Sequence, residues 1–294
     1  MINLRQLHDL TKNNEKTVNF LLDNKLISDV YLCSKCGNLM TIQKGGKTKI
    51  GHRYRCPRPC RQEKCLLKNS FFENCSIEIS KMLEFLYYWA SEACSYKNMQ
   101  REIGMSSHAF VAWRSFCRDI CIEKVSELDD MIGGEGKEVQ IDESAFTKRK
   151  YNRGQIYPTQ WVFGGIDSSN NDCFMEMVSD RSKNTLVEVI RRRIRPGTTI
   201  ISDCWASYEG LEIYGYTHKT VNHSRNFVDP VSLVHTQKIE SLWFISKRRN
   251  KRECGTNRKF LSSYLAEFIW RKRIAGSDPF SKILEGISSL YKFE

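Results

Sequence analysis

The chain has 294 residues, of which 40% are hydrophobic and 11% aromatic, enough for one large domain or two to three small ones with a packed core. Its net charge of +12 favours a polyanionic partner, either nucleic acid or an acidic membrane surface. The sequence has no run of about 18 apolar residues and begins without the apolar core of a signal peptide. We therefore expect an intracellular protein with no membrane partner, nuclear in a eukaryote or in the cytoplasm or nucleoid of a bacterium.

The N-terminal region, 1–29, is predicted to form one or two short helices with apolar positions Leu7, Leu10, Val18, Leu21 and Leu22. Composition changes over 30–75, where cysteines, glycines, basic residues and two prolines replace the helical period. A segment this poor in apolar residues needs another source of stability, and a bound metal is one.

Cysteines cluster in this second segment, which holds six of the 12 in the chain. Cys33 and Cys36 form one closely spaced pair, and Cys56 and Cys60 form another about twenty residues later. Two such pairs predict a zinc ribbon, because each pair places two thiolates on one turn and tetrahedral Zn(II) takes two from each. The second pair is less standard, so Cys65 is an alternative to Cys60, and Cys75 and His52 are spare candidates. Unliganded surface cysteines are the other interpretation.

The segment 76–130 is predicted to be helical, with helices over 77–95, 97–104 and 107–123. The last two, joined near Gly104, are typical of a helix-turn-helix that would present His108 and Arg114 to the major groove. A helical hairpin that packs its aromatic face into a core fits the same pattern. The net charge favours DNA.

The segment 138–274 follows a linker within 131–137 and has a mixed α/β pattern. Strands are predicted over 138–142, 160–167, 173–179, 198–203 and 217–222, and helices over 184–194, 205–213, 236–250 and 256–273. We expect the first three strands to form an antiparallel meander and the later ones, which alternate with helices, to pair in parallel. The remaining residues, 275–294, are expected to be a C-terminal helix or tail.

Three acids in this segment are candidate metal ligands. Asp142 ends the first strand, Asp203 ends the fourth, and Glu240 lies in a later helix beside a basic run. Each alone has an ordinary explanation as a turn residue or a solvated helix position. Together they match the oxygen ligands that Mg(II) prefers, and a pair of such ions supports phosphoryl chemistry. By strand alternation Asp142 shares a face with Gln140, whereas Glu143 points the other way and is expected to orient the following basic loop or pair with one of its lysines.

Several blocks of the sequence, in this order and spacing, resemble a known family. They are "CSKCG", "YRCPRPCR", "NSFFENC", "VQIDESAFTKRKYNRG", "WVFGGID", "IISDCWASYEGL" and "HTQKIESLWFISKRR". From about residue 30 to 273 the chain is similar to Merlin-type cut-and-paste DNA transposases and their bacterial insertion-sequence relatives. The resemblance implies an RNase H-like fold in which the first and fourth strands are adjacent. It also implies a DDE triad of Asp142, Asp203 and Glu240, and it places His235 where the family has a histidine before its third acid, either near DNA or as a helix cap.

Basic runs flank the candidate acids in the sequence. Those we expect to contact DNA are Lys148, Arg149, Lys150, Arg153, His235, Lys247, Arg248 and Arg249. Phosphates are the natural partners of such side chains, although charge runs are more commonly solvated surfaces.

The sequence thus predicts an α/β, RNase H-like catalytic domain preceded by a zinc ribbon and a helix-turn-helix-like segment. The expected function is a DNA transposase that binds terminal inverted repeats, cleaves DNA in a Mg-dependent reaction and transfers the strand to a target (cut-and-paste transposition). Expected cofactors are two Mg(II) or Mn(II) ions and one structural Zn(II), and the protein is expected to form a homo-oligomer on DNA. The alternatives are a domesticated, non-catalytic DNA-binding protein and an RNase H-like nuclease without strand transfer.

Overall fold

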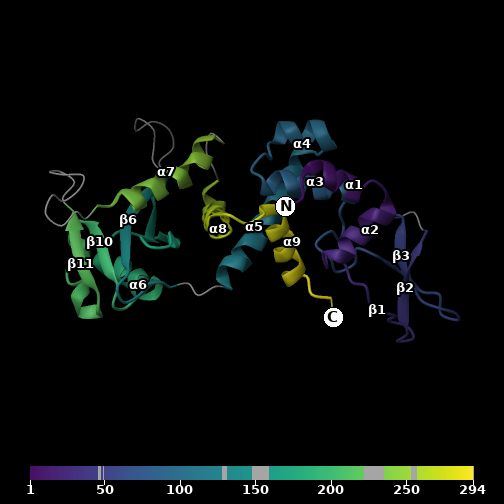
Figure 1. Ribbon diagram of the computed structural model, residues 1–294, viewed down its shortest axis with the longest axis horizontal. Coiled ribbons are helices and arrows are strands. Elements are labelled where there is room, and N and C mark those ends of the chain that lie inside the picture. The colour runs from purple at the N-terminus through teal and green to yellow at the C-terminus, as the bar shows by residue number, and fades with distance from the viewer. Residues whose placement is uncertain are drawn as a thin grey trace. The chain divides into compact units, whose positions relative to one another are not determined.

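The fold is described from a computed structural model, which divides into two compact units, Met1–Ile120 with Ile274–Glu294, and Cys121–Arg273 (Figure 1). The structure describes residues 1–45, 48, 50–127, 131–147, 159–221, 235–252 and 257–293. The basic residues Lys148, Arg149, Lys150 and Arg153 lie outside these ranges. Each unit is described by itself.

The first unit opens with two short helices, α1 (Leu4–Leu10) and α2 (Asn14–Asp23), as predicted for 1–29. Each begins after an asparagine whose side chain accepts a backbone N–H: Asn3 from Gln6, and Asn13 from Lys16, both over 2.9 Å. Such caps satisfy N–H groups that have no partner within the helix.

A four-stranded antiparallel sheet follows, formed by β1 (Tyr31–Leu32), β2 (Leu39–Lys44), β3 (His52–Arg55) and β4 (Glu63–Cys65) in that order. The buried Tyr54 ties the sheet to the preceding chain, because its hydroxyl donates to the carbonyl of Ser28 over 2.5 Å. Two turns, one between β1 and β2 and one between β3 and β4, carry the predicted cysteine pairs.

The other helices of the first unit are α3 (Ile79–Ala90), α4 (Tyr96–Ile103), α5 (Ser107–Ser126), which continues into the second unit, and α9 (Pro279–Leu290). Helix α3 ends five residues earlier than predicted. Gly104 (φ 70°) ends α4, so only a short turn separates it from α5, on which Phe110 and Trp113 are buried and His108 is exposed. Arg114 lies over the Phe110 ring, 5.2 Å from its centroid. Helix α9 belongs to this unit through contacts such as the edge-to-face pair of Phe280 and Tyr87.

The second unit is built on a five-stranded mixed sheet in the order β11-β10-β6-β7-β8. Its strands are β6 (Glu138–Thr147), β7 (Gln160–Asp167), β8 (Cys173–Val178), β10 (Thr199–Asp203) and β11 (Thr217–Val221). The first three form the predicted antiparallel meander, and β10 pairs in parallel with both β6 and β11. The adjacency of the first and fourth strands, expected of an RNase H-like arrangement, is confirmed.

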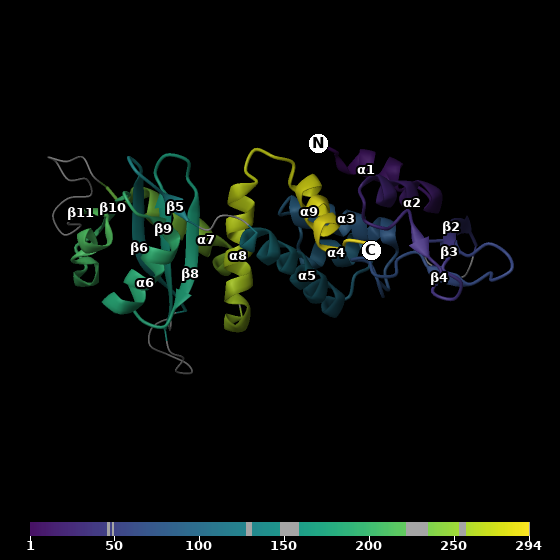
Figure 2. The ribbon, with the colours of Figure 1, turned by 90° about the horizontal axis from the view of Figure 1, so that it is seen from below.

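Helices cover both faces of this sheet (Figures 1 and 2). Helix α6 (Lys183–Arg193) packs on the face that holds Val139 and Ile141, and α7 (Gln237–Arg252) and α8 (Leu261–Arg273) pack on the other. The predicted helix over 205–213 is instead two 3₁₀ turns, η2 (Ala206–Tyr208) and η3 (Leu211–Tyr214), separated by Gly210 at φ 81°. A third 3₁₀ turn, η4 (Arg258–Phe260), precedes α8.

Strand β5 (Ile132–Gly133) lies within the stretch expected to be a linker and pairs in parallel with β9 (Ile194–Arg195), which follows α6; neither strand was predicted. Two residues are too few to show a period, so only their pairing reveals them.

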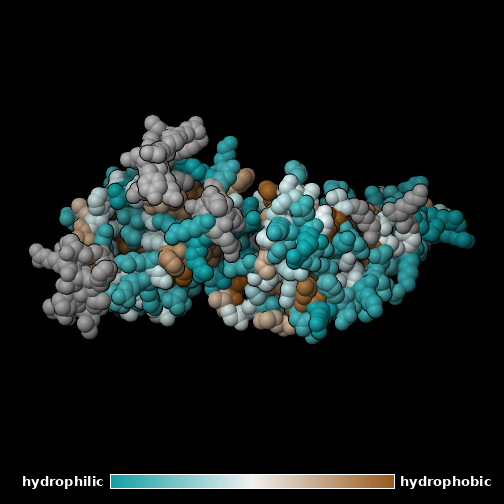
Figure 3. Space-filling model, turned by 90° about the horizontal axis from the view of Figure 1, so that it is seen from above, coloured by the Kyte–Doolittle hydropathy of each residue, from teal (hydrophilic) through white to brown (hydrophobic). Residues whose placement is uncertain are grey.

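On the face of the molecule drawn in Figure 3, hydrophilic residues dominate, and hydrophobic residues show as small separate patches. Across the described ranges, no helix is long and apolar enough to span a membrane.

Candidate functional site

Two of the candidate acids lie at the same level on neighbouring parallel strands. Thr199 of β10 is opposite Glu138 of β6, and Ile201 is opposite Gln140, a constant offset of 61 residues (199 − 138 = 201 − 140 = 61). The same offset carried two residues further places Asp203 at the level of Asp142. Paired residues of parallel strands point to the same face, so both carboxylates lie on the face of Gln140.

Helix α7 crosses this face in step with β6. Gln140 accepts the backbone N–H of Ile239 over 3.1 Å, Asp142 accepts from Trp243, and Ser144 accepts from Lys247 over 2.5 Å. Contacts four residues apart on the helix therefore meet residues two apart on the strand. Four helical residues rise about 6 Å and two strand residues rise about 6.6 Å, so the match holds over two turns.

This alignment places Glu240, in the first turn of α7, near the level of the two aspartates. Gln140 fixes the start of the helix, since its side-chain oxygen also accepts the N–H of Lys238 over 2.9 Å. Glu240 itself is exposed, and its Oε1 accepts from the hydroxyl of Thr236 over 3.2 Å. His235 stands just before the helix, where its Nδ1 accepts the N–H of Gln237 over 3.4 Å, in keeping with a capping position.

Trp243 holds the Asp142 side chain in place. Its indole Nε1 donates to Oδ2 of Asp142 over 2.9 Å. The ring fits because Gly164, which pairs with Asp142 on β7, has no side chain: a Cβ there would lie 2.7 Å from Cη2 of Trp243. Neither residue was predicted as part of the site. The double glycine in the apolar strand "WVFGGID" is the sequence signal for such a close approach.

The three candidate acids interact electrostatically. Burial raises the pKa of Asp142 to about 6, and the nearby carboxylates of Asp203 and Glu240 act in the same direction. Hydrogen bonds from the backbone of Glu143 and from Trp243 oppose that rise without cancelling it. Asp203 accepts the N–H of Trp205 over 3.0 Å. The cost of ionising Asp142 here would fall if a cation were shared.

The carboxylate oxygens of the three acids nevertheless lie further apart than the ligand atoms of a preformed metal site. In the part of the chain that the structure describes, the cysteines form the group whose ligand atoms all lie within 4.8 Å of one another, and the three acids do not form a second. Their donors are carboxylate oxygens on one face, the ligand type that Mg(II) or Mn(II) takes. The donor set therefore fits a divalent cation in its chemistry.

Glu143 points to the opposite face, as strand alternation predicted, but its partner was not predicted. The hydroxyl of Tyr208 donates to its Oε1 over 2.7 Å. Burial raises the pKa of Glu143 to about 7, against the effect of this hydrogen bond. The lysines of the basic loop lie outside the described residues, and within these residues Glu143 bonds to a buried tyrosine of η2.

The basic residues of α7 differ from one another in their surroundings. Lys247 lies on the same face as Asp142, with its Nζ 5.2 Å from the ring centroid of Phe146. Arg248 is exposed. Arg249 does not fit the expected DNA contact: its side chain is only 18% exposed and pairs with Glu267 of α8, which is 3% exposed. Because a buried carboxylate needs such a partner, Arg249 joins α7 to α8.

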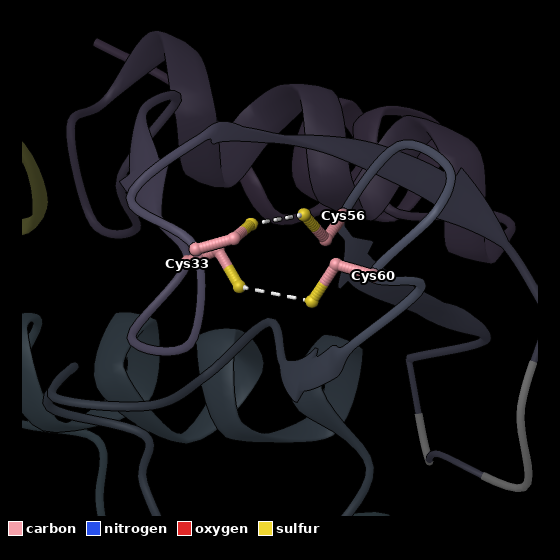
Figure 4. A group of neighbouring side chains, drawn as sticks. Cys33, Cys56 and Cys60 are labelled. Atoms are coloured by element: carbon pink, nitrogen blue, oxygen red, sulfur yellow. Dashed lines mark hydrogen bonds between the residues drawn. The ribbon is translucent and has the colours of Figure 1, made fainter.

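The first unit contains a separate candidate metal site of four cysteines (Figure 4). The Sγ atoms of Cys33, Cys36, Cys56 and Cys60 lie within 4.8 Å of one another, with Cys33 and Cys60 at 3.7 Å and Cys36 and Cys56 at 3.3 Å. Tetrahedral zinc with Zn–S bonds of about 2.3 Å separates its sulfurs by about 3.8 Å, so the donor set fits Zn(II). Cys65 stands on β4, outside this group.

Local backbone geometry favours a thiolate in this cluster. Burial acts to raise the pKa of Cys33, but N–H groups of Lys35 and Cys36 and the thiols of Cys36 and Cys60 outweigh it, lowering that pKa to about 6. Gly37, at φ 71°, closes the first turn, with its N–H donating to the carbonyl of Cys33 over 2.8 Å. The turn that brings two cysteines together thus also stabilises the charged form of the first.

Comparison with known proteins identifies the second unit. The model of the ISXO2-like transposase domain family matches residues 125–273, just over half of the chain and nearly the whole of that unit. The chain belongs to the ISXO2-like transposase family, a class of enzymes that cut and transfer DNA.

Two single proteins are similar over part of the chain. An uncharacterized transposase-like protein of Haemophilus influenzae is 28% identical over 87 residues, which cover 30% of this chain and 69% of that protein. The HTLV-2 integrase catalytic core domain, solved in a dimeric form with magnesium, is 10% identical, with a TM-score of 0.30 over 47% of this chain and 84% of that one. No conclusion about fold or function follows from a likeness at that level.

Proposed function

We propose that this protein is a DNA transposase whose DDE triad is Asp142, Asp203 and Glu240. One observation carries the proposal: the β6–β10 register places Asp203 level with Asp142 on the face crossed by the helix that bears Glu240. All three residues fall within the range matched by the transposase family. The RNase H-like assignment of this sheet and the narrower Merlin resemblance are parts of the same proposal.

The protein contributes to the proposed chemistry by holding the three carboxylates in position. Asp142 is held by Trp243 in a buried position. Gln140 fixes the start of α7, the helix on which Glu240 lies near Asp142. Two Mg(II) or Mn(II) ions held by these carboxylates would activate an attacking oxygen and stabilise a leaving oxygen on a phosphodiester. Lys247, further along the same face, is positioned to contact a phosphate of the bound strand.

The first unit is proposed to bind the terminal inverted repeats, with Zn(II) held by Cys33, Cys36, Cys56 and Cys60 to stabilise its sheet. The exposed His108 on α5 supports the helix-turn-helix interpretation, whereas Arg114, which lies over Phe110, supports the packing one. A homo-oligomer on DNA, expected for an enzyme that joins two ends, remains a prediction.

Cleavage of DNA that carries the element's flanking terminal repeats tests this function. In Mg(II), Asp142→Asn and Asp203→Asn should bind the DNA like the wild-type protein and lose cleavage by at least about a thousandfold, the scale of removing a group that acts on the transition state. Glu188→Gln, an exposed acid of α6, is the matched control and should cleave normally. Full cleavage by either aspartate variant would exclude the triad.

A target-joining assay separates the proposed transposase from a nuclease that shares the site. Transposition requires that the cleaved end become covalently joined to target DNA, whereas a nuclease stops at the cut. Binding without any metal-dependent cleavage by the wild-type protein would instead favour a non-catalytic DNA-binding protein.

A further inference from the structure

An arginine stacked between two tryptophans lies close to the candidate acids. The Cζ atom of Arg181 is 4.1 Å from the ring centroid of Trp161 and 4.6 Å from that of Trp205. Its carbonyl accepts from Nε1 of Trp205 over 3.5 Å and from the hydroxyl of Ser207 over 2.9 Å. These two hydrogen bonds hold the segment that follows β10 against the segment that follows β8.

The topology brings these three residues to the edge of the sheet where the acids lie. Trp161 is near the start of β7, opposite Ala145 of β6 and Val178 of β8. Arg181 follows the end of β8, and Trp205 follows the end of β10. Because β7 runs opposite to the other three strands, its beginning and their ends share one edge. The link to the site is direct, since the N–H of Trp205 donates to Oδ1 of Asp203 over 3.0 Å.

Packing alone does not account for this arrangement. Trp205 is 41% exposed, so much of its indole is open to solvent rather than buried in the core. Arg181 is close enough to Glu143 for its charge to act on the pKa of that carboxyl in the lowering direction, but no hydrogen bond from its guanidinium to an acceptor is found among the residues that the structure describes. Stacking holds the planar guanidinium in position without using its donors, which leaves them for a ligand such as a phosphate.

We propose that Trp161, Arg181 and Trp205 form a platform that holds one DNA strand beside the scissile phosphate. Arg181 contacts a backbone phosphate, and the exposed indole of Trp205 stacks on an adjacent nucleobase, which need not be paired at that position. Trp161 is a positioning residue that keeps Arg181 extended. The proposal rests on the proposed function for its biological meaning, because it places the strand next to Asp203.

Binding of a fluorescently labelled 20-nucleotide single-stranded DNA of mixed sequence to the full, zinc-loaded chain tests the platform without any cleavage. In Mg(II)-free buffer, Trp205→Ala should weaken binding about 5- to 150-fold, the range for loss of one base–aromatic stack. Arg181→Ala should weaken binding and reduce the slope of log affinity against log salt by about 0.7, the value for one single-strand phosphate contact. Arg191→Ala, an arginine that lies over Tyr214 elsewhere in the same unit, is the matched control and should change neither.

Tryptophan emission gives a second readout that survives if Trp205→Ala fails to fold. Trp205→Phe keeps an aromatic ring, so it should retain most of the affinity but lose most of the quenching that DNA causes in the wild-type protein. Wild-type affinity and salt slope in both Trp205→Ala and Arg181→Ala, or unchanged quenching in Trp205→Phe, would overturn the platform.

The cleavage assay distinguishes the failure of this inference from failure of the proposed function. If strand binding is independent of Trp205 and Arg181 while cleavage still requires Asp142, the platform alone is refuted. If strand binding depends on both residues while Asp142→Asn cleaves normally, the platform stands and the triad is refuted.

Discussion

The indole of Trp243 donates a hydrogen bond to the carboxylate of Asp142 over 2.9 Å, across 101 positions of sequence. This bond joins the fifth residue of β6 to the middle of α7, the helix that also carries Glu240. It acts on Asp142 in two ways, since it orients one oxygen and lowers a pKa that burial raises.

Trp243→Phe should therefore shift the pH dependence of cleavage. Removing the donor leaves the carboxylate ion less stabilised, so the pKa of Asp142 rises above about 6 and the acid limb of the pH–rate profile moves to higher pH by about one to two units. Trp270→Phe, which alters another buried tryptophan of the same unit, should leave the limb in place. An unshifted profile in Trp243→Phe would show that the bond does not tune Asp142.

Gly164→Ala should destabilise the second unit through the same tryptophan. A Cβ at this position would lie 2.7 Å from Cη2 and 3.0 Å from Cζ2 of Trp243, and overpacking of this kind costs about 1–3 kcal/mol. Urea unfolding measures the loss. The double variant with Trp243→Phe should recover part of the stability, because the smaller ring removes the clash, but it should not recover the Asp142 hydrogen bond. If Gly164→Ala lowered the free energy of unfolding equally with tryptophan or phenylalanine at position 243, the clash would not be with this ring.

Stability should depend on pH and Mg(II) through Asp142. Its pKa is raised from 3.8 to about 6, so the folded protein binds more protons than the unfolded chain between these values and stability falls as pH rises through this window. The loss above pH 6 is about 1–3 kcal/mol. Asp142→Asn, which removes this charge, should be more stable than the wild-type protein at pH 8 and no more stable below pH 4.

Millimolar Mg(II) should reverse that difference at pH 8 by binding the folded wild-type protein. Thermal unfolding of both proteins with and without the ion measures this difference in stability. Glu143, whose pKa is also raised, is present in both proteins, so its contribution cancels in the comparison. Equal stabilisation of Asp142→Asn by Mg(II) would argue that Asp142 is not a ligand.

The cysteine cluster predicts a clear difference between two neighbouring thiols. Cys60→Ser should lose the zinc, about one ion per chain, together with the thermal stability of the first unit. Cys65→Ser should retain both, since Cys65 lies on β4 outside the cluster. Metal analysis and thermal unfolding decide between them, and the reverse result would make Cys65 the fourth ligand.

Sequence patterns predicted most of the elements correctly because their signals are local. The alternation of Val139, Gln140 and Ile141 identifies a strand and assigns Asp142 and Glu143 to opposite faces. The exceptions are also local in origin. The helix expected over 205–213 breaks at Gly210 (φ 81°), which prevents a continuous helix and leaves two 3₁₀ turns.

By itself, then, the sequence determined which residues were candidates: four cysteines on two turns, two strand aspartates, a helical glutamate and the faces they occupy. It placed the end of the first strand wrongly at Asp142, because β6 continues to Thr147, whereas β10 does end at Asp203. Tertiary structure alone decided which candidates have which partners. It placed Cys60 rather than Cys65 in the cluster, turned Arg249 towards Glu267 and set Arg181 between two tryptophans. Spacing along a chain reports neighbours within a turn or two, whereas these pairings depend on strand register and helix packing between segments far apart in sequence.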